Sequence, residues 1–430
     1  MSIKKENPKI DFVSNENQIL DFWEKNEIFQ KLVNQNSKGE KWSFLDGPIT
    51  ANNPMGVHHA WGRTLKDLYQ RYKSMNGHQL RYQNGFDCQG LWVEIEVEKE
   101  LGIKSKKEVE ELGIEKFVNL CKERVKKYSD VQTQQSKRLG YWMDWENSYY
   151  TMSDENNYAI WAFLKKLFNE EKIYRGTDVV PWSGRSGTSY SQMEIIEGRK
   201  LTVHKGVFVK LPLKDRENEN ILIWTTTPWT LSSNIAVAVN KKINYAKIQL
   251  PDKSIYYVAE NNLKFQRLSK EFSEKKNWID GVPKLKTLDQ IFKERGGYKI
   301  VNKIKGEDMI GWNYEGPYDY LEPQKTLGGY PNINQEAKDD GLTAIQCHVI
   351  VDGGKDSEGN DMVVEGEGTG IVHMAGGCGA IDNKICKKEG FVEISPIDNQ
   401  ANFIDGFDFM SGLNVTDSDT AKKIIQDLKD

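Results

Sequence analysis

The spacing of hydrophobic and polar positions changes once along this chain, near residue 195. Before that point, apolar residues recur every three or four positions, which is typical of helices that pack along one face. One such run contains Trp61, Leu65, Leu68, Tyr72 and Met75. Other helices are predicted over residues 16–34 and 154–171, on a segment that ends at Leu101, and on a longer one that carries Phe117, Leu120, Cys121, Val125, Tyr128 and Val131 on one face.

Short strands predicted at residues 42–45 and 79–84 alternate with these helices. Such alternation indicates a parallel sheet with crossover connections, so the first part is predicted to be a doubly wound α/β domain. After the change, β-rich runs separated by Gly-rich turns favour a barrel or another compact β domain. These runs lie at residues 203–213, 221–227, 235–239, 245–250, 254–259 and 298–301.

The chain is therefore expected to contain an α/β domain over residues 1–195 and an inserted β-rich domain over residues 196–415. A polar helix with a few apolar positions is predicted over residues 416–430. A length of 430 residues, of which 38% are hydrophobic, is enough for two or three domains with cores of their own.

Composition excludes several classes of function. The net charge of −4 gives no global basic field, so any contact with nucleic acid has to come from local patches. The sequence has no apolar stretch near bilayer length, and its first residues lack the apolar region of a signal peptide. Five scattered cysteines indicate reduced thiols and a cytoplasmic location rather than a disulfide framework.

Two adjacent histidines, His58 and His59, stand where a predicted strand and a Gly/Pro/Asn loop lead into a helix. A helix N-terminus offers unpaired N–H groups and a partial positive charge, which together favour an anion. The pattern predicts a cradle for nucleotide phosphates. The alternative is an ordinary turn with two solvent-facing histidines, because such loops are first of all turns.

A second strand-to-helix loop carries Asp87. Because ligands of open α/β sheets bind beyond the carboxyl ends of the strands, this loop is expected to face the histidine loop. A carboxylate at that position could hold an ammonium group by a charge-assisted hydrogen bond. The alternative for Asp87 is a helix cap or a surface turn.

Five stretches contain more specific patterns: Asp46–His59, Gly85–Leu91, Gly140–Trp145, Trp224–Leu231 and Gly368–Ala375. Together they resemble the class I aminoacyl-tRNA synthetases, and within them the isoleucine-specific branch. The Thr-Thr-Thr-Pro-Trp-Thr order of residues 225–230 separates that branch from valyl and leucyl relatives, which usually carry Thr-Thr-Arg-Pro. The resemblance implies the first half of a Rossmann-type nucleotide-binding domain with an inserted, barrel-like editing domain.

For amino-acid activation, the resemblance implies ATP as a substrate, accompanied by Mg²⁺. His59 matches the final histidine of the family's His-x-Gly-His signature, whereas Gly56 replaces the first histidine and His58 replaces the glycine. His58 is hypothesised to supply the missing imidazole. The implied catalytic residues are His58 and His59, and the implied ATP-binding residues are Asn53, Gly56, His58 and His59. The implied amino-acid-binding residues are Gly47, Pro48 and Asp87.

The resemblance also implies hydrolytic editing of mischarged valyl-tRNA. One missing methylene is worth only about 1–3 kcal/mol, a limit for which isoleucine and valine are themselves the usual example, so a second site has to correct the first. Asp382 matches the family residue that holds the amino group, and His373 matches the histidine that limits side-chain size. The implied editing residues are Thr225, Thr226, Thr227, Asn234, His373 and Asp382. Taken alone, three adjacent threonines are ordinary β-branched strand residues.

No metal site is predicted. His373, Cys378, Asp382 and Cys386 are spaced too loosely for zinc. Relatives often carry a Cys-x-x-Cys zinc knuckle before the editing insertion, but here Ser183 and Ser186 occupy those positions. Serine hydroxyls are poor zinc ligands, so hydrogen bonds are expected to hold this turn instead.

The family's second signature loop and anticodon-binding domain have no counterpart here, so the chain resembles the N-terminal portion of a synthetase. The complete enzyme would be a monomer that uses tRNA-Ile, isoleucine and ATP without a membrane, whereas this portion is expected to be inactive in aminoacylation and to expose apolar surface. A free-standing editing hydrolase, a valyl-type synthetase and a non-catalytic tRNA-binding module remain alternatives.

Overall fold

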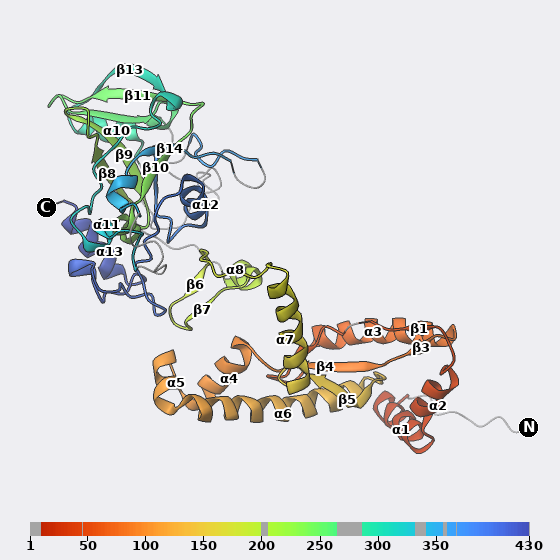
Figure 1. Cartoon of the computed structure of the whole chain (residues 1–430). Coiled ribbons are helices and arrows are strands. Elements are labelled where there is room, and N and C mark those ends of the chain that lie inside the picture. The colour runs from red at the N-terminus through yellow and green to blue at the C-terminus, as the bar shows by residue number, and fades with distance from the viewer. Residues whose placement is uncertain are drawn as a thin grey trace, which may run out of the picture. The chain divides into compact units, whose positions relative to one another are not determined.

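The computed structural model divides into two compact units, Met1–Arg175 and Gly176–Asp430 (Figure 1). It describes residues 10–44, 46–198, 205–264, 286–331, 341–355, 359–366 and 368–429. None of the helices in these ranges is long and apolar enough to cross a membrane.

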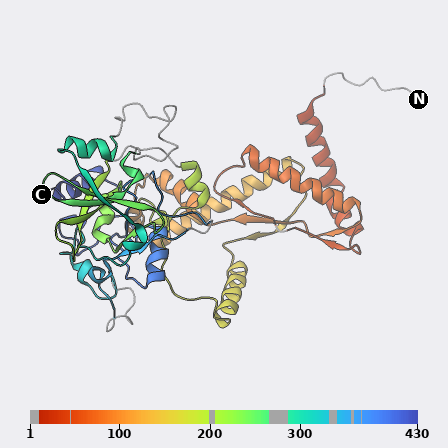
Figure 2. The same ribbon diagram turned by 90° about the horizontal axis from the view of Figure 1, so that it is seen from above.

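Among its described residues, the first unit combines helices with short strands that pair in parallel (Figures 1 and 2). Its sheets have the orders β2-β4-β5 and β1-β3. The predicted parallel α/β organisation is confirmed. Its helices are α1 (Phe12–Lys25), α2 (Ile28–Gln35), α3 (Val57–Met75), α4 (Leu91–Leu101), α5 (Lys106–Leu112), α6 (Ile114–Arg138) and α7 (Asp154–Asn169). Its strands are β1 (Lys41–Trp42), β2 (Ile49–Thr50), β3 (Gln79–Leu80), β4 (Gln83–Asp87) and β5 (Asp144–Tyr150).

Three local predictions for this unit need correction. The strand expected over residues 79–84 is interrupted, because Tyr82, with φ of 52°, lies between β3 and β4. The single helix expected over residues 16–34 is two helices, because Glu27 between them takes a left-handed conformation with φ of 50° and the Asn26 side chain caps the end of α1. The strand expected over residues 42–45 is shorter, since β1 ends at Trp42. Leu45 lies outside the described residues.

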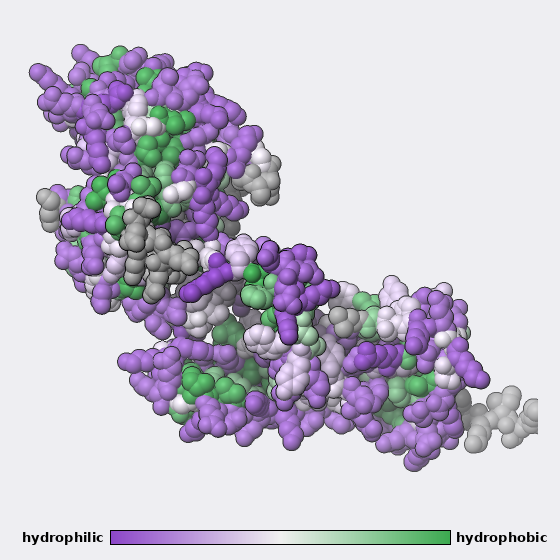
Figure 3. Space-filling model, viewed as in Figure 1, coloured by the Kyte–Doolittle hydropathy of each residue, from purple (hydrophilic) through white to green (hydrophobic). Residues whose placement is uncertain are grey.

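Helix α3 forms as predicted, but its apolar stripe faces outward. Trp61, Leu68 and Tyr72 are each more than 60% exposed. Its buried positions are polar instead: Arg63, Gln70 and Ser74. In Figure 3, hydrophobic residues interrupt the hydrophilic surface of both units. The helical spacing therefore identified the apolar face of α3, but it did not predict that the opposite, polar face is the buried one.

Among the described residues, the second unit contains two larger sheets, with the orders β13-β11-β12-β9-β8 and β14-β10-β15, and the two-stranded sheet β6-β7; most of its strand pairs are antiparallel. Both orders are open, and no closed barrel forms among the described strands. The strands are β6 (Trp182–Ser183), β7 (Thr188–Ser189), β8 (Val207–Pro212), β9 (Glu219–Thr225), β10 (Ala236–Val239), β11 (Asn244–Gln249), β12 (Ile255–Ala259), β13 (Lys299–Lys305), β14 (Ile350–Asp352) and β15 (Val372–Met374).

All six β-rich runs predicted after residue 195 contain a strand, although residues 203 and 204 lie outside the described ranges. The helix expected near the C-terminus is also confirmed, as α13. The helices are α8 (Gln192–Gly198), α10 (Leu288–Glu294), α11 (Glu322–Lys325), α12 (Ala380–Glu389) and α13 (Ser418–Asp427), with 3-10 turns η1 (Pro228–Ser233), η2 (Asn261–Leu263), η4 (Gly306–Asp308), η6 (Ala344–Cys347) and η7 (Asp408–Met410).

The boundary between the units falls before the one expected at residues 195–196. The β6–β7 hairpin belongs to the second unit because it is tied to residues far along the chain. The indole N–H of Trp182 donates to the Asn399 carbonyl at 3.0 Å, and the Thr177 hydroxyl donates to Glu393 at 2.9 Å.

We expect the exposed α3 stripe to make this chain self-associate, because contiguous apolar surface of this kind is rarely left in water. The double variant Leu68→Lys/Tyr72→Lys should sediment more slowly than the unmodified chain at equal concentration. Ile310→Lys, an exposed apolar position of the second unit, serves as the control and should not change sedimentation. A strictly monomeric unmodified chain at all concentrations would contradict the expectation.

Candidate functional site

Strands β2 and β4 bring the two predicted loops of the first unit together. Thr50 pairs in register with Asp87, and the Thr50 hydroxyl donates to the Asp87 carboxylate at 2.8 Å. The main chain closes the same corner, since the N–H of Ala51 donates to the Asp87 carbonyl at 2.9 Å. These contacts place Asp87 beside the start of the loop that leads to the histidines, and that the two loops face one another stays a prediction. Thr50, which leaves the other carboxylate oxygen for a ligand, had no sequence signal.

The two histidines occupy the first turn of α3, where unpaired N–H groups gather. The Nδ1 atom of His59 accepts a hydrogen bond from the Gly56 N–H at 3.2 Å, so the neutral ring carries its proton on Nε2. Burial, with smaller contributions from His58 and Arg63, lowers the pKa of His59. His59 can therefore donate to a phosphate oxygen through Nε2 without being charged.

His58 lies over Gly56. A Cβ atom added at position 56 would stand 2.9 Å from the Cε1 atom of His58 and 3.0 Å from its Nδ1 atom. The two histidine rings lie with their centroids 3.8 Å apart. The imidazole of His58 thus fills space that a side chain at position 56 would need.

Helix α6 holds the loop that precedes the histidines. Buried Gln132 donates to the carbonyls of Thr50 and Asn53, at 3.0 and 2.8 Å. Buried Arg124 donates to the Asn52 carbonyl at 2.9 Å and to the Asn53 side chain at 2.8 Å. The Asn53 amide, expected to bind ATP, is therefore engaged by the protein itself.

Gly47 and Pro48 lie just before β2, the first exposed and the second partly buried. Buried Asp46 forms an ion pair with Lys66 of α3, and its carbonyl accepts from the Tyr149 hydroxyl at 2.9 Å. These contacts fix the start of the loop, and nothing in them shows an amino-acid pocket.

In the second unit, a pocket of about 210 Å³ joins the threonine stretch to the Gly-Thr-Gly stretch. Its lining residues are Trp224, Thr225, Thr226, Met362, Val364, Gly368, Thr369, Gly370, Ile371 and Val372. Thr227, Asn234, His373 and Asp382, also predicted for this site, are not among them. Thr227 nevertheless shapes the lining turn, because its N–H donates to the Thr225 hydroxyl at 3.0 Å.

His373 faces the interior, where both ring nitrogens are engaged. Its Nδ1 atom lies 3.0 Å from the Asn234 amide nitrogen, and its Nε2 atom lies 2.8 Å from the Thr230 hydroxyl. The Thr230 hydroxyl in turn donates to the Thr227 carbonyl at 2.8 Å. Burial lowers the pKa of His373 to about 4, so the ring is neutral near pH 7.

Asp382 lies in the first turn of α12, partly buried. Its carboxylate accepts a hydrogen bond from the Ala375 N–H at 3.0 Å. Burial raises the pKa of Asp382, and the hydrogen bond from Ala375 opposes that change. A carboxylate that is poorly solvated in this way gains from a cationic partner such as an ammonium group.

The serine turn is held by hydrogen bonds, as expected. The hydroxyl of buried Ser183 accepts from the Ser186 N–H at 3.2 Å, and the Ser183 carbonyl accepts from the Gly187 N–H at 2.8 Å. Within the described ranges, no three His, Cys, Asp or Glu side chains are grouped closely enough to hold a metal ion.

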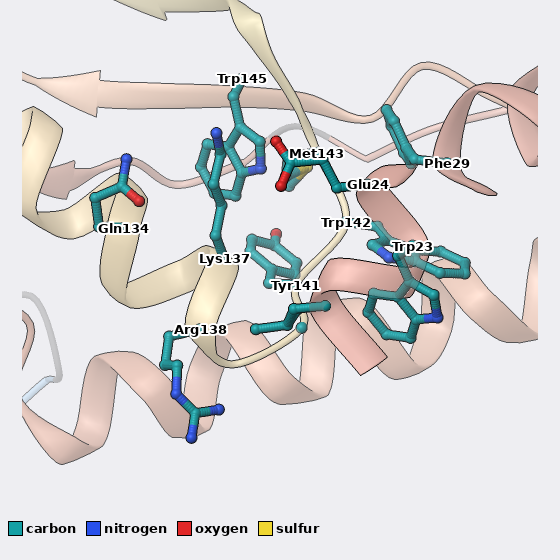
Figure 4. A pocket seen from close by; sticks show the side chains of 12 residues that line it. Trp23, Glu24, Phe29, Gln134, Lys137, Arg138, Tyr141, Trp142, Met143 and Trp145 are labelled. Atoms are coloured by element: carbon teal, nitrogen blue, oxygen red, sulfur yellow. The ribbon is translucent and has the colours of Figure 1, made fainter. Parts of the chain in front are cut away.

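A larger cavity, of about 570 Å³, lies in the first unit and contains none of the predicted site residues. Figure 4 shows Trp23, Tyr141 and Trp145 around it, with Lys137 and Glu24 at its edge. It lies where α1 approaches the segment after α6, so it belongs to the packing of the N-terminal helix.

The comparisons with known proteins decide the family. The family described as tRNA synthetases class I (I, L, M and V) matches residues 18–352 of this chain. The chain belongs to this family.

Three relatives of this class I synthetase chain are isoleucine–tRNA ligases. The one from Clostridium tetani is 36% identical over 96% of this chain and 35% of its own length. Those from Clostridium acetobutylicum and Methanocaldococcus jannaschii are 35% and 32% identical, each over 99% of this chain and over 36% and 37% of their own lengths. The chain therefore spans about a third of the length of the relatives it matches.

Among solved structures, a LeuRS from Agrobacterium radiobacter K84 matches with a TM-score of 0.34 and 15% identity. The match covers 54% of this synthetase chain and 33% of the other one. This likeness is too weak to bear on the fold.

The sequence analysis did not identify the side chains that position both candidate sites through hydrogen bonds. In the first unit these are Arg124 and Gln132, and in the second they are Thr230 and Tyr314. The only available signal was polar residues at helical spacing on α6, and that pattern is equally typical of a solvated face.

Gln132→Ala should loosen the loop before the histidines, because two loop carbonyls lose their donor. We expect a cost of about 1–3 kcal/mol in local stability. Hydrogen exchange of the amides of residues 51–56 measures it, and those amides should exchange faster. Gln134→Ala, an exposed glutamine of the same helix, is the matched control. Equal exchange in both variants would show that α6 does not hold the loop.

Proposed function

We propose that this chain is the N-terminal activation and editing portion of an isoleucine–tRNA ligase, acting on isoleucine, ATP and tRNA-Ile in the cytoplasm. The observation that carries the proposal is the similarity to isoleucine–tRNA ligases over nearly the whole chain. The five free cysteines favour a reducing compartment. The remainder of the relatives' length would supply what aminoacylation needs in addition.

The β2–β4 corner supports the activation half of the proposal. Asp87 would hold the ammonium group of isoleucine with the oxygen that Thr50 leaves free. His59 would donate from Nε2 to a phosphate of ATP, at a helix N-terminus that itself favours anions. Charge that develops on the phosphate during adenylate formation would then meet donors already in place. Mg²⁺ would accompany the ATP phosphates, as it usually does in phosphate sites.

The contact between Gly56 and His58 supports the idea that His58 replaces the missing first histidine. Its ring lies above position 56, which is where a family member would carry that imidazole. In this proposal the histidine and the glycine of the signature have exchanged positions, and an imidazole remains in the region of the phosphates.

His58→Ala in a full-length enzyme that carries this segment should slow isoleucine-dependent ATP–pyrophosphate exchange by about 100-fold, the usual cost of one stabilising donor. Gly56→Ala should also slow it, because the added Cβ would displace the His58 ring. Gly62→Ala, where a Cβ meets nothing within 4 Å, is the matched control. Exchange that His58→Ala leaves untouched would end the replacement hypothesis.

The second unit supports the editing half. The pocket of about 210 Å³ has threonine hydroxyls on one wall and Gly368–Val372 on another, which suits a small polar ligand rather than a large apolar one. Asp382 would hold the amino group of a misattached valine, and Thr225 and Thr226 would position the attacking water and the terminal adenosine.

Asp382→Asn should change editing and stability in opposite directions. Hydrolysis of valyl-tRNA-Ile should fall about 10- to 100-fold, the value of a charge-assisted hydrogen bond. Because burial raises the pKa of Asp382, its charged form destabilises the fold, so the variant should have the higher Tm at pH 7. Below the ordinary pKa of an aspartic acid, the carboxyl is protonated in both folded and unfolded states and this advantage should vanish.

Asp215→Asn, at an exposed site, is the control for this substitution and should alter neither quantity. A variant that keeps full hydrolysis would remove Asp382 from the editing site.

A free-standing editing hydrolase is the second candidate. It is favoured by the separate core of the second unit, which is built from β8–β10, β14 and the residues around α12. Hydrolysis of valyl-tRNA by the chain carrying His59→Ala, with activation thus disabled, would favour this candidate. Hydrolysis only in the presence of the remaining synthetase sequence would favour the first.

A further inference from the structure

A one-directional series of hydrogen bonds runs through the buried part of the second unit. The Tyr314 hydroxyl donates to Asn234 Oδ1 at 2.6 Å, and burial raises the pKa of Tyr314 far enough that it remains a donor. The Asn234 amide nitrogen lies 3.0 Å from His373 Nδ1. The series continues from His373 Nε2 to the Thr230 hydroxyl and from there to the Thr227 carbonyl.

The orientation of the Asn234 amide fixes the direction of this series. Its nitrogen also donates to the Ala236 carbonyl at 3.1 Å, and a carbonyl can only accept. A flipped amide would place its oxygen at this distance from the Ala236 carbonyl, where neither oxygen can donate. Asn234 therefore donates to His373, and the Nδ1 atom of His373 must be unprotonated.

Two further side chains contact the main-chain carbonyl of Asn234. His348 stacks on the Tyr314 ring, with centroids 5.1 Å apart and planes at 15°, and its Nε2 lies 3.2 Å from the Asn234 carbonyl. Gln324 donates to the same carbonyl at 3.2 Å. Asn234, His348 and Gln324 are each about 1% exposed, so this group is closed to water and to ligands.

We propose that Asn234 is a positioning residue that fixes His373 as the neutral ring protonated on Nε2, and that this ring, through Thr230, holds the turn of residues 225–227 that lines the pocket. Asn234 then acts on editing without touching the ligand. The part that concerns hydrolysis rests on the proposed editing function, whereas the part that concerns the ring proton does not.

Asn234→Asp tests the proposal, because it replaces the donor nitrogen by an acceptor of the same size. In ¹⁵N NMR spectra of histidine-labelled chain at neutral pH, His373 should be protonated on Nε2 only, and in the variant it should be protonated on both nitrogens. Asn240→Asp is the matched control: Asn240 is also buried and donates to a carbonyl, that of Val363, but does not contact His373. The control should keep the unmodified spectrum of His373.

A ring protonated on Nδ1 in the unmodified chain, or an unchanged ring in Asn234→Asp, would overturn the proposal. If that variant does not fold, Thr230→Val replaces it. That variant removes the acceptor at Nε2 but leaves Asn234 donating to Nδ1, so the ring should stay protonated on Nε2. Movement of the proton to Nδ1 would then overturn the proposal.

Hydrolysis of valyl-tRNA-Ile is the second measurement. Asn234→Asp should lower kcat about 10-fold with little change in KM, because the pocket-lining turn moves while the ligand contacts remain. If the His373 ring of the variant is doubly protonated but kcat is unchanged, the ring does not hold the turn of residues 225–227. That result would overturn this step of the proposal. The enzyme for this measurement is a full-length synthetase that carries this segment. If that enzyme, without the substitution, does not hydrolyse the substrate, the proposed editing function fails, and the NMR result still decides the role of Asn234.

Discussion

Both sites depend on one constraint, that a polar side chain removed from water keeps a hydrogen-bond partner. In the first unit, Gln132 and Arg124 satisfy this by holding the main chain of the loop before α3. In the second unit, Tyr314 donates to Asn234, and Asn234 in turn contacts the ring of His373. The side chains that would contact a substrate are thus positioned by buried side chains that do not contact it. These buried side chains are themselves fixed by their hydrogen bonds.

The sequence was sufficient where a local pattern determines the structure. Parallel strands that end at one edge bring their loops together, so the sequence predicts Asp87 near the loop before α3, and the Thr50–Asp87 hydrogen bond joins Asp87 to the start of that loop. The strands of the second unit were found because their apolar runs are short and bounded by turns. Sequence motifs also gave the family, to which residues 18–352 belong.

The sequence was insufficient where the outcome depends on distant parts of the chain. Helical spacing identified the apolar stripe of α3. Which face of α3 is buried depends on contacts with distant residues, such as the hydrogen bond from Arg63 to Ser136 of α6. The motif predicts an editing role for His373, but in the structure its side chain faces the interior, where it contacts Asn234 and Thr230. Strand spacing predicted a barrel or another compact β domain, because spacing does not specify whether the edges of a sheet meet, and the described strands form open sheets.

The contact between Gly56 and His58 constrains how this signature can have diverged from the family form. A side chain added at position 56 would collide with the ring of His58, and a glycine at position 58 would leave the turn with the imidazole of His59 but without that of His58. The residue at position 58 therefore limits which side chain fits at position 56. The effect of a substitution at one of these positions should depend on the residue present at the other.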